Sequence, residues 1–133
     1  IGKMDRVVID APCTGTGTWR RRPDTKWKLT PDLLAQRVQE QSAILADAQR
    51  YLKPGGTLIY ITCSILPEEN DDQIAAFCAA HPDFTMVDPK ALWQAAFASA
   101  APAGVVTAGS GIALTPRLTN TDGFYLAALK RGA

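Results

Sequence analysis

Two short apolar runs on either side of a long amphipathic stretch constrain the fold of this chain more than any other feature. Residues 6–10 (RVVID) and 57–62 (TLIYIT) are rich in β-branched residues, which favour buried strands. The stretch between them carries a side-chain pattern that recurs every three or four residues, which is typical of one buried helical face. That face comprises Leu34, Val38, Gln41, Leu45, Ala48 and Leu52.

Local signals mark where the helices begin and end. Thr30 and Pro31 supply an N-cap and a first-turn proline, and the motif KPGG at residues 53–56 is expected to end this first helix. The motif PEEN at residues 67–70 predicts a second helix with acids in its first turn, where they favour the helix dipole. Further strands are predicted at residues 84–87 and 123–129.

Residues 91–116 hold no charged side chain and are crowded with Ala, Gly and Ser. Leu92, Trp93 and Phe97 predict a short helix at the beginning of this region. Residues 105–106 and 112–114 are expected to pair as a hairpin around residues 108–111.

Strands that alternate with helices predict an α/β fold with a mostly parallel sheet and right-handed crossovers. Such sheets place ligand chemistry beyond the carboxyl ends of their strands. Asp10 and Cys13 follow one predicted strand, and Cys63 follows another. If these strands are neighbours, about 4.8 Å apart, both thiols face one crevice.

Composition excludes several classes of protein. At 133 residues, with 47% hydrophobic and 20% charged side chains, the chain suits one globular domain and not a disordered segment. No apolar run approaches the roughly 20 residues of a membrane span, and the start does not resemble a signal peptide, so we expect a cytoplasmic protein. Three cysteines without a C-x-x-C pair and a single His predict neither a disulfide framework nor a metal site.

Positive charge is concentrated in one segment. Residues 19–28 carry a net charge of +4, whereas the whole chain carries +1. Cations interleaved with tryptophans offer phosphate contacts and base-stacking faces together, which favours RNA binding over an ordinary solvated surface. The predicted RNA-binding residues are Arg20, Arg21, Arg22, Lys26, Trp27 and Lys28, beside Trp19.

The motifs DAPCTGTG at 10–17 and TCS at 62–64, followed by PEEN, resemble the RNA (cytosine-5) methyltransferase family. The resemblance continues through RRPD at 21–24, KW at 26–27, KPGG at 53–56 and TDGF at 121–124. It implies the carboxyl-terminal half of a Rossmann-like class I S-adenosylmethionine-dependent methyltransferase sheet, with an antiparallel final strand. The cofactor-binding amino-terminal half is expected to lie upstream of Ile1.

Cytosine chemistry explains why such a site needs two thiols. Carbon 5 becomes nucleophilic only after a soft nucleophile adds to carbon 6, and a thiolate does this well. A base must later remove the proton from carbon 5, and a carboxyl group such as that of Asp10 can stabilise the adduct at ring nitrogen 3. The residues alone leave open which thiol attacks. The resemblance implies that Cys63 attacks, that Cys13 assists release, and that Asp10 lies at the pocket of S-adenosylmethionine and the target base.

The expected partner is RNA, with ribosomal RNA favoured over transfer RNA by the resemblance. A non-catalytic RNA-binding module is the alternative from another class, and a DNA cytosine-5 methyltransferase fragment is a further one. Taken alone, the chain is expected to be inactive and to bind S-adenosylmethionine poorly. An unpaired sheet edge beside residues 7–9 is expected to favour self-association.

Overall fold

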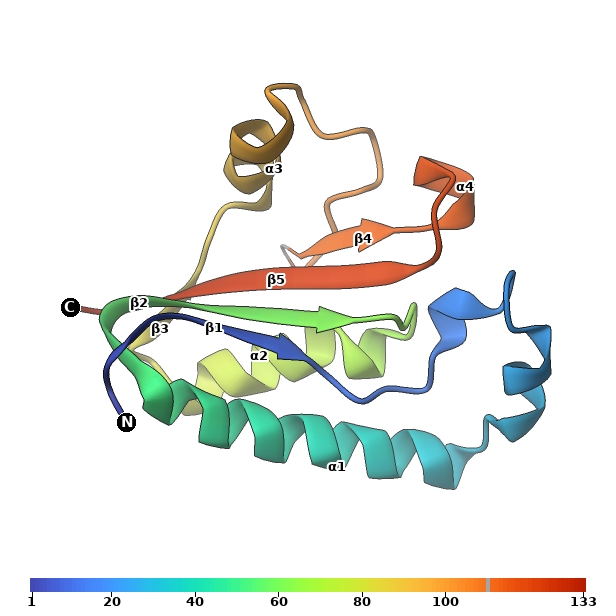
Figure 1. The fold of residues 1–133 in the computed structure, drawn as a ribbon, viewed down its shortest axis with the longest axis horizontal. Coiled ribbons are helices and arrows are strands. Elements are labelled where there is room, and N and C mark those ends of the chain that lie inside the picture. The colour runs from blue at the N-terminus through green and yellow to red at the C-terminus, as the bar shows by residue number, and fades with distance from the viewer. Residues whose placement is uncertain (110) are drawn as a thin grey trace.

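The chain folds into a five-stranded sheet with helices on both faces (Figure 1). The structure is a computed structural model that describes residues 1–109 and 111–133. The strand order is β1-β2-β5-β3, and β4 also pairs with β5. In chain order, the elements are β1 (Met4–Asp10), α1 (Pro31–Ala48), β2 (Leu52–Thr62), α2 (Asp71–Ala80), β3 (Phe84–Met86), α3 (Pro89–Phe97), β4 (Ile112–Leu114), α4 (Pro116–Thr119) and β5 (Phe124–Arg131).

The two apolar runs pair as parallel neighbours, as the sequence predicts. Val7 lies opposite Leu58, and Asp10 lies opposite Ile61. α1 forms the crossover between them, and it begins at the predicted cap, where the Thr30 hydroxyl accepts a hydrogen bond from the Leu33 N–H (3.1 Å). The carboxyl ends of β1 and β2 therefore lie side by side.

The prediction of a mostly parallel sheet is wrong, because among the strands of the described residues only β1 and β2 pair in parallel. β5 pairs antiparallel with β2, β3 and β4. β3 still points the same way as β2, as strand–helix–strand repeats predict, but β5 inserts between them and runs the opposite way. The antiparallel final strand is confirmed, and its central place makes the sheet mixed.

The prediction that the first helix continues to Leu52 is also wrong. α1 ends at Ala48, a 3-10 turn follows, and Leu52 begins β2. Leu52 is 0% exposed, as a residue on the buried face of a helix would be. Its spacing from Ala48 also matches the helical repeat, so the sequence pattern could not distinguish this buried strand residue from a helical one. Residues 53–56 form an irregular part of β2, where the register shifts between Met4 and Arg6 of β1. None of the helices among the described residues has the length and apolar character needed to cross a membrane.

The region after β3 contains the predicted short helix and part of the predicted hairpin. α3 spans Pro89–Phe97. Val106 bridges Ile112 in antiparallel fashion, and the Ala113 N–H donates to the Val105 carbonyl (2.8 Å). The proposed turn at residues 108–111 includes Ser110, which lies outside the described residues.

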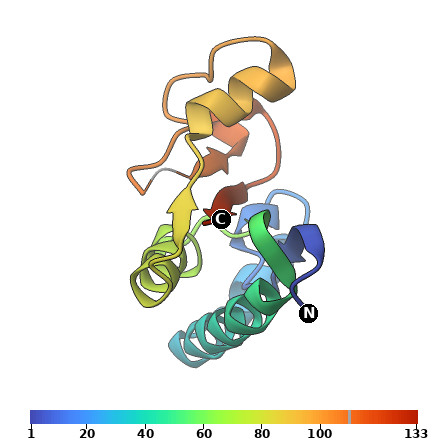
Figure 2. The same ribbon diagram turned by 90° about the vertical axis from the view of Figure 1, so that its left-hand side faces the viewer.

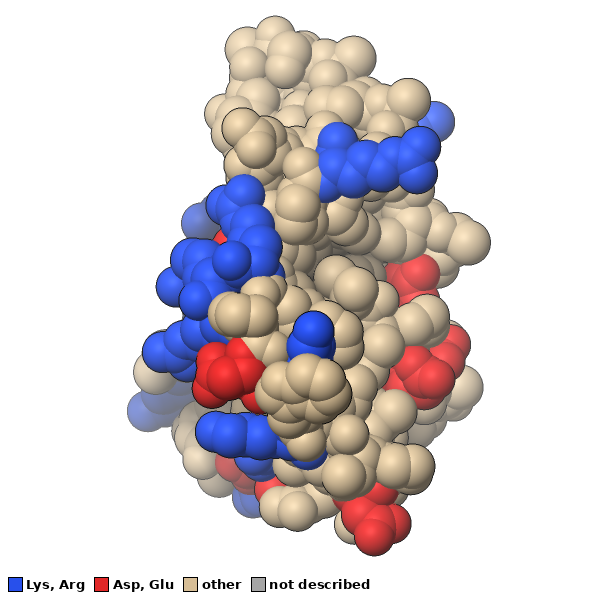
Figure 3. Space-filling view, turned by 90° about the vertical axis from the view of Figure 1, so that its right-hand side faces the viewer, with Lys and Arg blue, Asp and Glu red and all other residues tan. Residues whose placement is uncertain are grey.

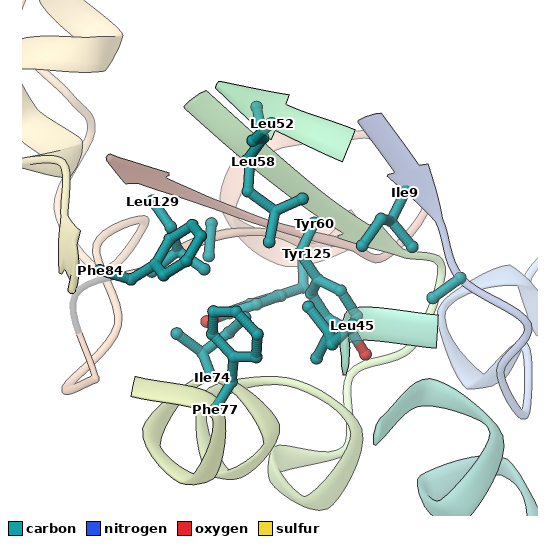
Figure 4. Close-up of a cluster of buried hydrophobic side chains, with 12 residues drawn as sticks. Ile9, Leu45, Leu52, Leu58, Tyr60, Ile74, Phe77, Phe84, Tyr125 and Leu129 are labelled. Carbon is teal, nitrogen blue, oxygen red and sulfur yellow. The ribbon is translucent and has the colours of Figure 1, made fainter. Parts of the chain in front are cut away.

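The hydrophobic core lies between the sheet and the helix pair α1 and α2. Figures 1 and 2 show both helices on one side of the sheet and α3 on the other. Alternate residues of β2, Leu58 and Tyr60, point into this core together with Leu45 of α1 and Ile74 of α2 (Figure 4). The core thereby fixes the ends of β1 and β2 against the helices.

Leu58→Ala should test how far this core supports the strand pair. The side chain is 0% exposed, so its truncation should lower the free energy of unfolding by about 2–5 kcal/mol. Leu118→Ala, at a side chain that is 40% exposed, should change it by less than about 1 kcal/mol. Urea unfolding of both variants measures the difference, and equal losses would contradict this assignment of the core.

Candidate active site

The side chains of Cys13 and Cys63 meet beyond the carboxyl ends of β1 and β2. Their sulfur atoms lie 3.3 Å apart, within hydrogen-bonding distance, and both thiols are free and half-buried. Cys63 directly follows β2, and Cys13 lies three residues after β1. The parallel pairing brings these two loops to one edge of the sheet, where the strand order predicted them.

The hydrogen bond between the thiols makes them electrostatically unequal. It lowers the pKa of Cys63 to about 7, because a donated S–H stabilises the thiolate. The same bond, together with burial, raises the pKa of Cys13, which therefore keeps its proton. The charges of Asp10 and Glu69 oppose thiolate formation at Cys63 with a smaller effect. Near neutral pH, Cys63 therefore carries more thiolate than Cys13 does.

Asp10 lies at the rim of the same site. Its side chain is exposed at the end of β1, and its charge is close enough to raise the pKa of Cys63. Asp10 also borders an open hollow of about 540 Å³ between β1 and α1, whose wall includes Val7, Ile44 and Tyr51. Among the described residues, no group of three or more His, Cys, Asp or Glu is arranged to hold a metal ion.

The loop after Cys13 crosses the segment before β5 in close backbone contact. The Gly17 N–H donates to the Cys63 carbonyl (2.8 Å), and the Gly123 N–H donates to the Gly17 carbonyl (2.7 Å). A Cβ atom on Gly17 would lie 2.2 Å from the Gly123 carbonyl oxygen, so the crossing requires glycine. This contact joins the loops of both cysteines to the start of β5.

Sequence reasoning missed Glu69, an acid that is 0% exposed. Its carboxylate accepts hydrogen bonds from the N–H (2.8 Å) and hydroxyl (2.7 Å) of Thr14, from the Gln41 amide (3.1 Å) and from the Ser64 hydroxyl. The motif PEEN predicted only first-turn acids, and Glu69 instead lies in a 3-10 turn before α2. The hydroxyl residues beside both cysteines were the available signal, because buried hydroxyls need an acceptor.

Asn70, the next residue, brackets Cys63 from both sides. Its side-chain oxygen accepts from the Thr62 hydroxyl (2.6 Å), and its side-chain amide donates to the Ser64 carbonyl (2.9 Å). All three of these residues are buried. Asn70 thereby fixes the backbone on which the Cys63 side chain is mounted.

Arg20 and Arg21, in the first part of the basic segment, are held next to the contact between Gly17 and Gly123. Arg20 and Arg21 both form ion pairs with Asp122, the residue before Gly123, and the Arg20 Nε lies 2.6 Å from its carboxylate. Hydrogen bonds from Arg20 and Arg21 hold the pKa of Asp122 below its usual range. These two arginines therefore have a structural partner that the sequence did not reveal.

The second part of the basic segment is exposed. Lys26 and Trp27 lie in the 3-10 turn Pro23–Lys28, with the Lys26 Nζ 4.9 Å from the centre of the Trp27 ring. The Trp27 side chain is 79% exposed, and Arg22 and Lys28 are exposed beside it. Figure 3 shows Lys and Arg side chains gathered in a patch on the face that carries this segment.

Comparisons with known proteins match nearly the whole chain. A family model described as 16S rRNA methyltransferase RsmB/F matches residues 1–130. Ribosomal RNA small subunit methyltransferase B of Sodalis glossinidius is 47% identical over 124 residues, which are 93% of this chain and 25% of that relative. The chain therefore spans about a quarter of the length of such curated relatives.

Two solved structures share the fold. The crystal structure of PH0851 superimposes with a TM-score of 0.84 at 34% identity, covering 98% of this chain and 27% of that one. NSun6 from Pyrococcus horikoshii with SFG gives a TM-score of 0.72 at 23% identity, covering 95% of this chain and 29% of that one.

The unequal thiols should give distinct pH profiles of alkylation. Because the thiolate is the reactive form, carboxamidomethylation of Cys63 should rise with pH through a midpoint of about 7. Cys13→Ala removes the stabilising S–H donor and should shift this midpoint to higher pH. Cys78, whose pKa is raised by burial, is the internal control and should react slowly at neutral pH. Peptide mass spectrometry measures all three rates, and an unchanged Cys63 midpoint in the variant would refute the hydrogen bond.

Proposed function

The chain belongs to the RsmB/F family of 16S rRNA methyltransferases, and we propose that it forms the target-base half of an enzyme that methylates carbon 5 of cytosine in ribosomal RNA. Its relatives are ribosomal RNA small subunit methyltransferases, which favours ribosomal over transfer RNA as the substrate. The chain spans a quarter of those relatives, and we infer from the resemblance of its motifs that it is the carboxyl-terminal part of a catalytic domain.

The observation that carries this proposal is the thiol pair. Two cysteines 3.3 Å apart, one with a lowered and one with a raised pKa, supply a nucleophile and a proton-handling group at one point. A purely structural pair of buried cysteines needs no such asymmetry. The lower pKa of Cys63 also agrees with the role that the sequence resemblance implies for it.

In the first step, the Cys63 thiolate adds to carbon 6 of the cytosine ring. A carbon–sulfur bond forms, and the electrons of the 5,6 double bond move to make carbon 5 nucleophilic. S-adenosylmethionine, which the Asp10 carboxylate at the rim of the site would help to hold, would supply the methyl group for carbon 5 from its sulfonium. Cys13 keeps its proton during attack, because its pKa is raised.

In the second step, the product leaves Cys63. Carbon 5 now carries both a methyl group and a proton, and the Cys13 sulfur, once deprotonated, removes that proton. The released electrons restore the 5,6 double bond and expel Cys63 as a thiolate. In the adduct Cys63 is a thioether and no longer a thiolate, so the hydrogen bond that raised the pKa of Cys13 is lost. Cys13 can then give its own proton to solvent before it acts as the base, and protons balance over the cycle.

Asp10 lies where it could contact both the cytosine ring and S-adenosylmethionine. Its exposed carboxyl group lies near Cys63, where it can hydrogen-bond the ring around nitrogen 3. Asp10 borders the open hollow beside β1, and its carboxylate favours a cationic sulfonium. This hollow is open on one side, so the isolated chain should be inactive and bind S-adenosylmethionine weakly.

The basic segment fits the backbone and bases of RNA. The exposed pair of Lys26 and Trp27 offers a cation and a stacking face, with Arg22 and Lys28 beside them. Arg20 and Arg21, which Asp122 holds, position the segment next to the thiol loops. We therefore assign the phosphate contacts to this segment.

Removal of each thiol should reveal its role in the full-length protein. Cys63→Ala should abolish both methylation and covalent adduct, because nothing else adds to carbon 6. Cys13→Ala should still allow attack and methyl transfer but slow the loss of the carbon 5 proton, so the adduct accumulates. Incubation with rRNA and S-adenosylmethionine, followed by denaturing electrophoresis, shows the adduct as a retarded band. Such a band from Cys63→Ala alone would reverse the assignment, and the absence of methyl transfer by the unaltered protein would refute the proposed function.

Lys26→Ala combined with Trp27→Ala should weaken RNA binding at every sequence tested. The loss of one phosphate contact should reduce the slope of log affinity against log salt by about 0.7 to 0.9. Lys130→Ala is the matched control, because Lys130 is exposed near the opposite end of the sheet. Filter binding across a salt series measures both slopes, and equal effects of the two changes would contradict an RNA contact at the basic segment.

A further inference from the structure

We propose that Glu69 is the positioning residue that sets the separation of the two thiols and places a negative charge beside Cys63. The geometry points to it because one buried carboxylate bonds the residue that follows each cysteine: Thr14 after Cys13, and Ser64 after Cys63. The role in catalysis rests on the proposed function, whereas the role in thiol geometry does not.

The contacts of Glu69 reach three segments of the chain: the loop after β1, helix α1 and the loop after β2. One carboxylate oxygen accepts from the Thr14 N–H (2.8 Å) and from the Gln41 amide of α1 (3.1 Å). The other accepts from the Thr14 and Ser64 hydroxyls. Gln41 also donates to the Pro12 carbonyl (2.9 Å), so the loop of Cys13 is held on both sides of the thiol.

A chain of hydroxyls extends this network between the two loops. The Thr16 and Ser64 hydroxyl oxygens lie 3.1 Å apart. Because the Ser64 proton goes to Glu69, the Thr16 hydroxyl donates to Ser64. The Ile65 N–H in turn donates to the Thr16 hydroxyl (3.0 Å), and the Leu66 N–H donates to the Ser64 hydroxyl (3.0 Å). The acceptor at the end of this chain is the Glu69 carboxylate.

Glu69 has no cationic partner among the ion pairs of the described residues. Four neutral donors surround a carboxylate that is 0% exposed. A buried charge without a counter-ion is costly, and here four hydrogen bonds offset that cost. Neutral donors leave the negative charge free to act on Cys63, where it opposes the thiolate. The residue thus affects both the distance between the thiols and the charge at Cys63.

The test compares three variants in the full-length protein with Glu68→Gln, the exposed neighbour in the same turn, as the matched control. Glu69→Ala removes the acceptor. Glu69→Asp keeps the charge but withdraws the oxygens from the loops. Glu69→Gln keeps the size and one acceptor, and the hydroxyls of Thr14 and Ser64 can turn to accept from its amide.

The readouts are a bifunctional alkylating reagent that bridges two adjacent thiols, and the pH profile of Cys63 alkylation. Glu69→Ala and Glu69→Asp should lower bridging of Cys13 to Cys63 about tenfold, and kcat for methylation about a hundredfold with little change in KM, because misplaced reacting groups lose rate. Glu69→Gln should restore most of the bridging and shift the Cys63 profile to lower pH. Cys78 alkylation, on α2, should stay unchanged and show that the variants are folded.

Wild-type bridging in Glu69→Asp with unchanged Cys78 reactivity would overturn the proposal, even if Glu69→Ala does not fold. An unshifted Cys63 profile in Glu69→Gln, or an equal loss in Glu68→Gln, would overturn it too. The bridging and alkylation measurements require neither RNA nor S-adenosylmethionine. They therefore judge Glu69 independently of whether the unaltered protein methylates RNA, which tests the proposed function.

Discussion

The parallel pairing of β1 with β2 is the interaction on which the rest of the structure depends. Because α1 carries the chain back to the amino-terminal end of the sheet, both strands end at the same edge. The residues that follow the two strands therefore lie next to each other, and Cys13 and Cys63 are among them. Core side chains such as Leu58 and Tyr60 hold β2 against the helices and so keep this edge in place.

A buried polar layer turns that proximity into defined geometry. Strand pairing alone fixes the backbone ends, but loops of a few residues can still place a side chain in several ways. Glu69 and Asn70 remove this freedom, because they form hydrogen bonds with the residues next to each thiol in the chain. The Tyr60 hydroxyl joins the core to the same layer by donating to the Glu69 carbonyl (2.7 Å). The hydrophobic core and the hydrogen bonds around the thiols are therefore directly connected.

The central place of β5 connects the basic segment to the thiols. Its antiparallel course brings residues 121–124 to the edge where β1 and β2 end, so Gly123 meets Gly17 and Asp122 meets Arg20 and Arg21. Had the final strand run parallel to β2, its start would lie at the other end of the sheet. The antiparallel direction therefore has a role in the site as well as in the fold.

The sequence by itself determined the strands β1 and β2, the cap of α1 and the position of both thiols at strand ends, because periodicity and capping depend on residues a few positions apart. It misjudged the end of α1, since a buried Leu52 suits a helix and a strand equally. Only the tertiary structure decided that β5 lies between β2 and β3, that Glu69 is buried among donors from α1 and two loops, and that Arg20 binds Asp122. The last contact joins residues 102 positions apart, and no local pattern encodes a partner that distant.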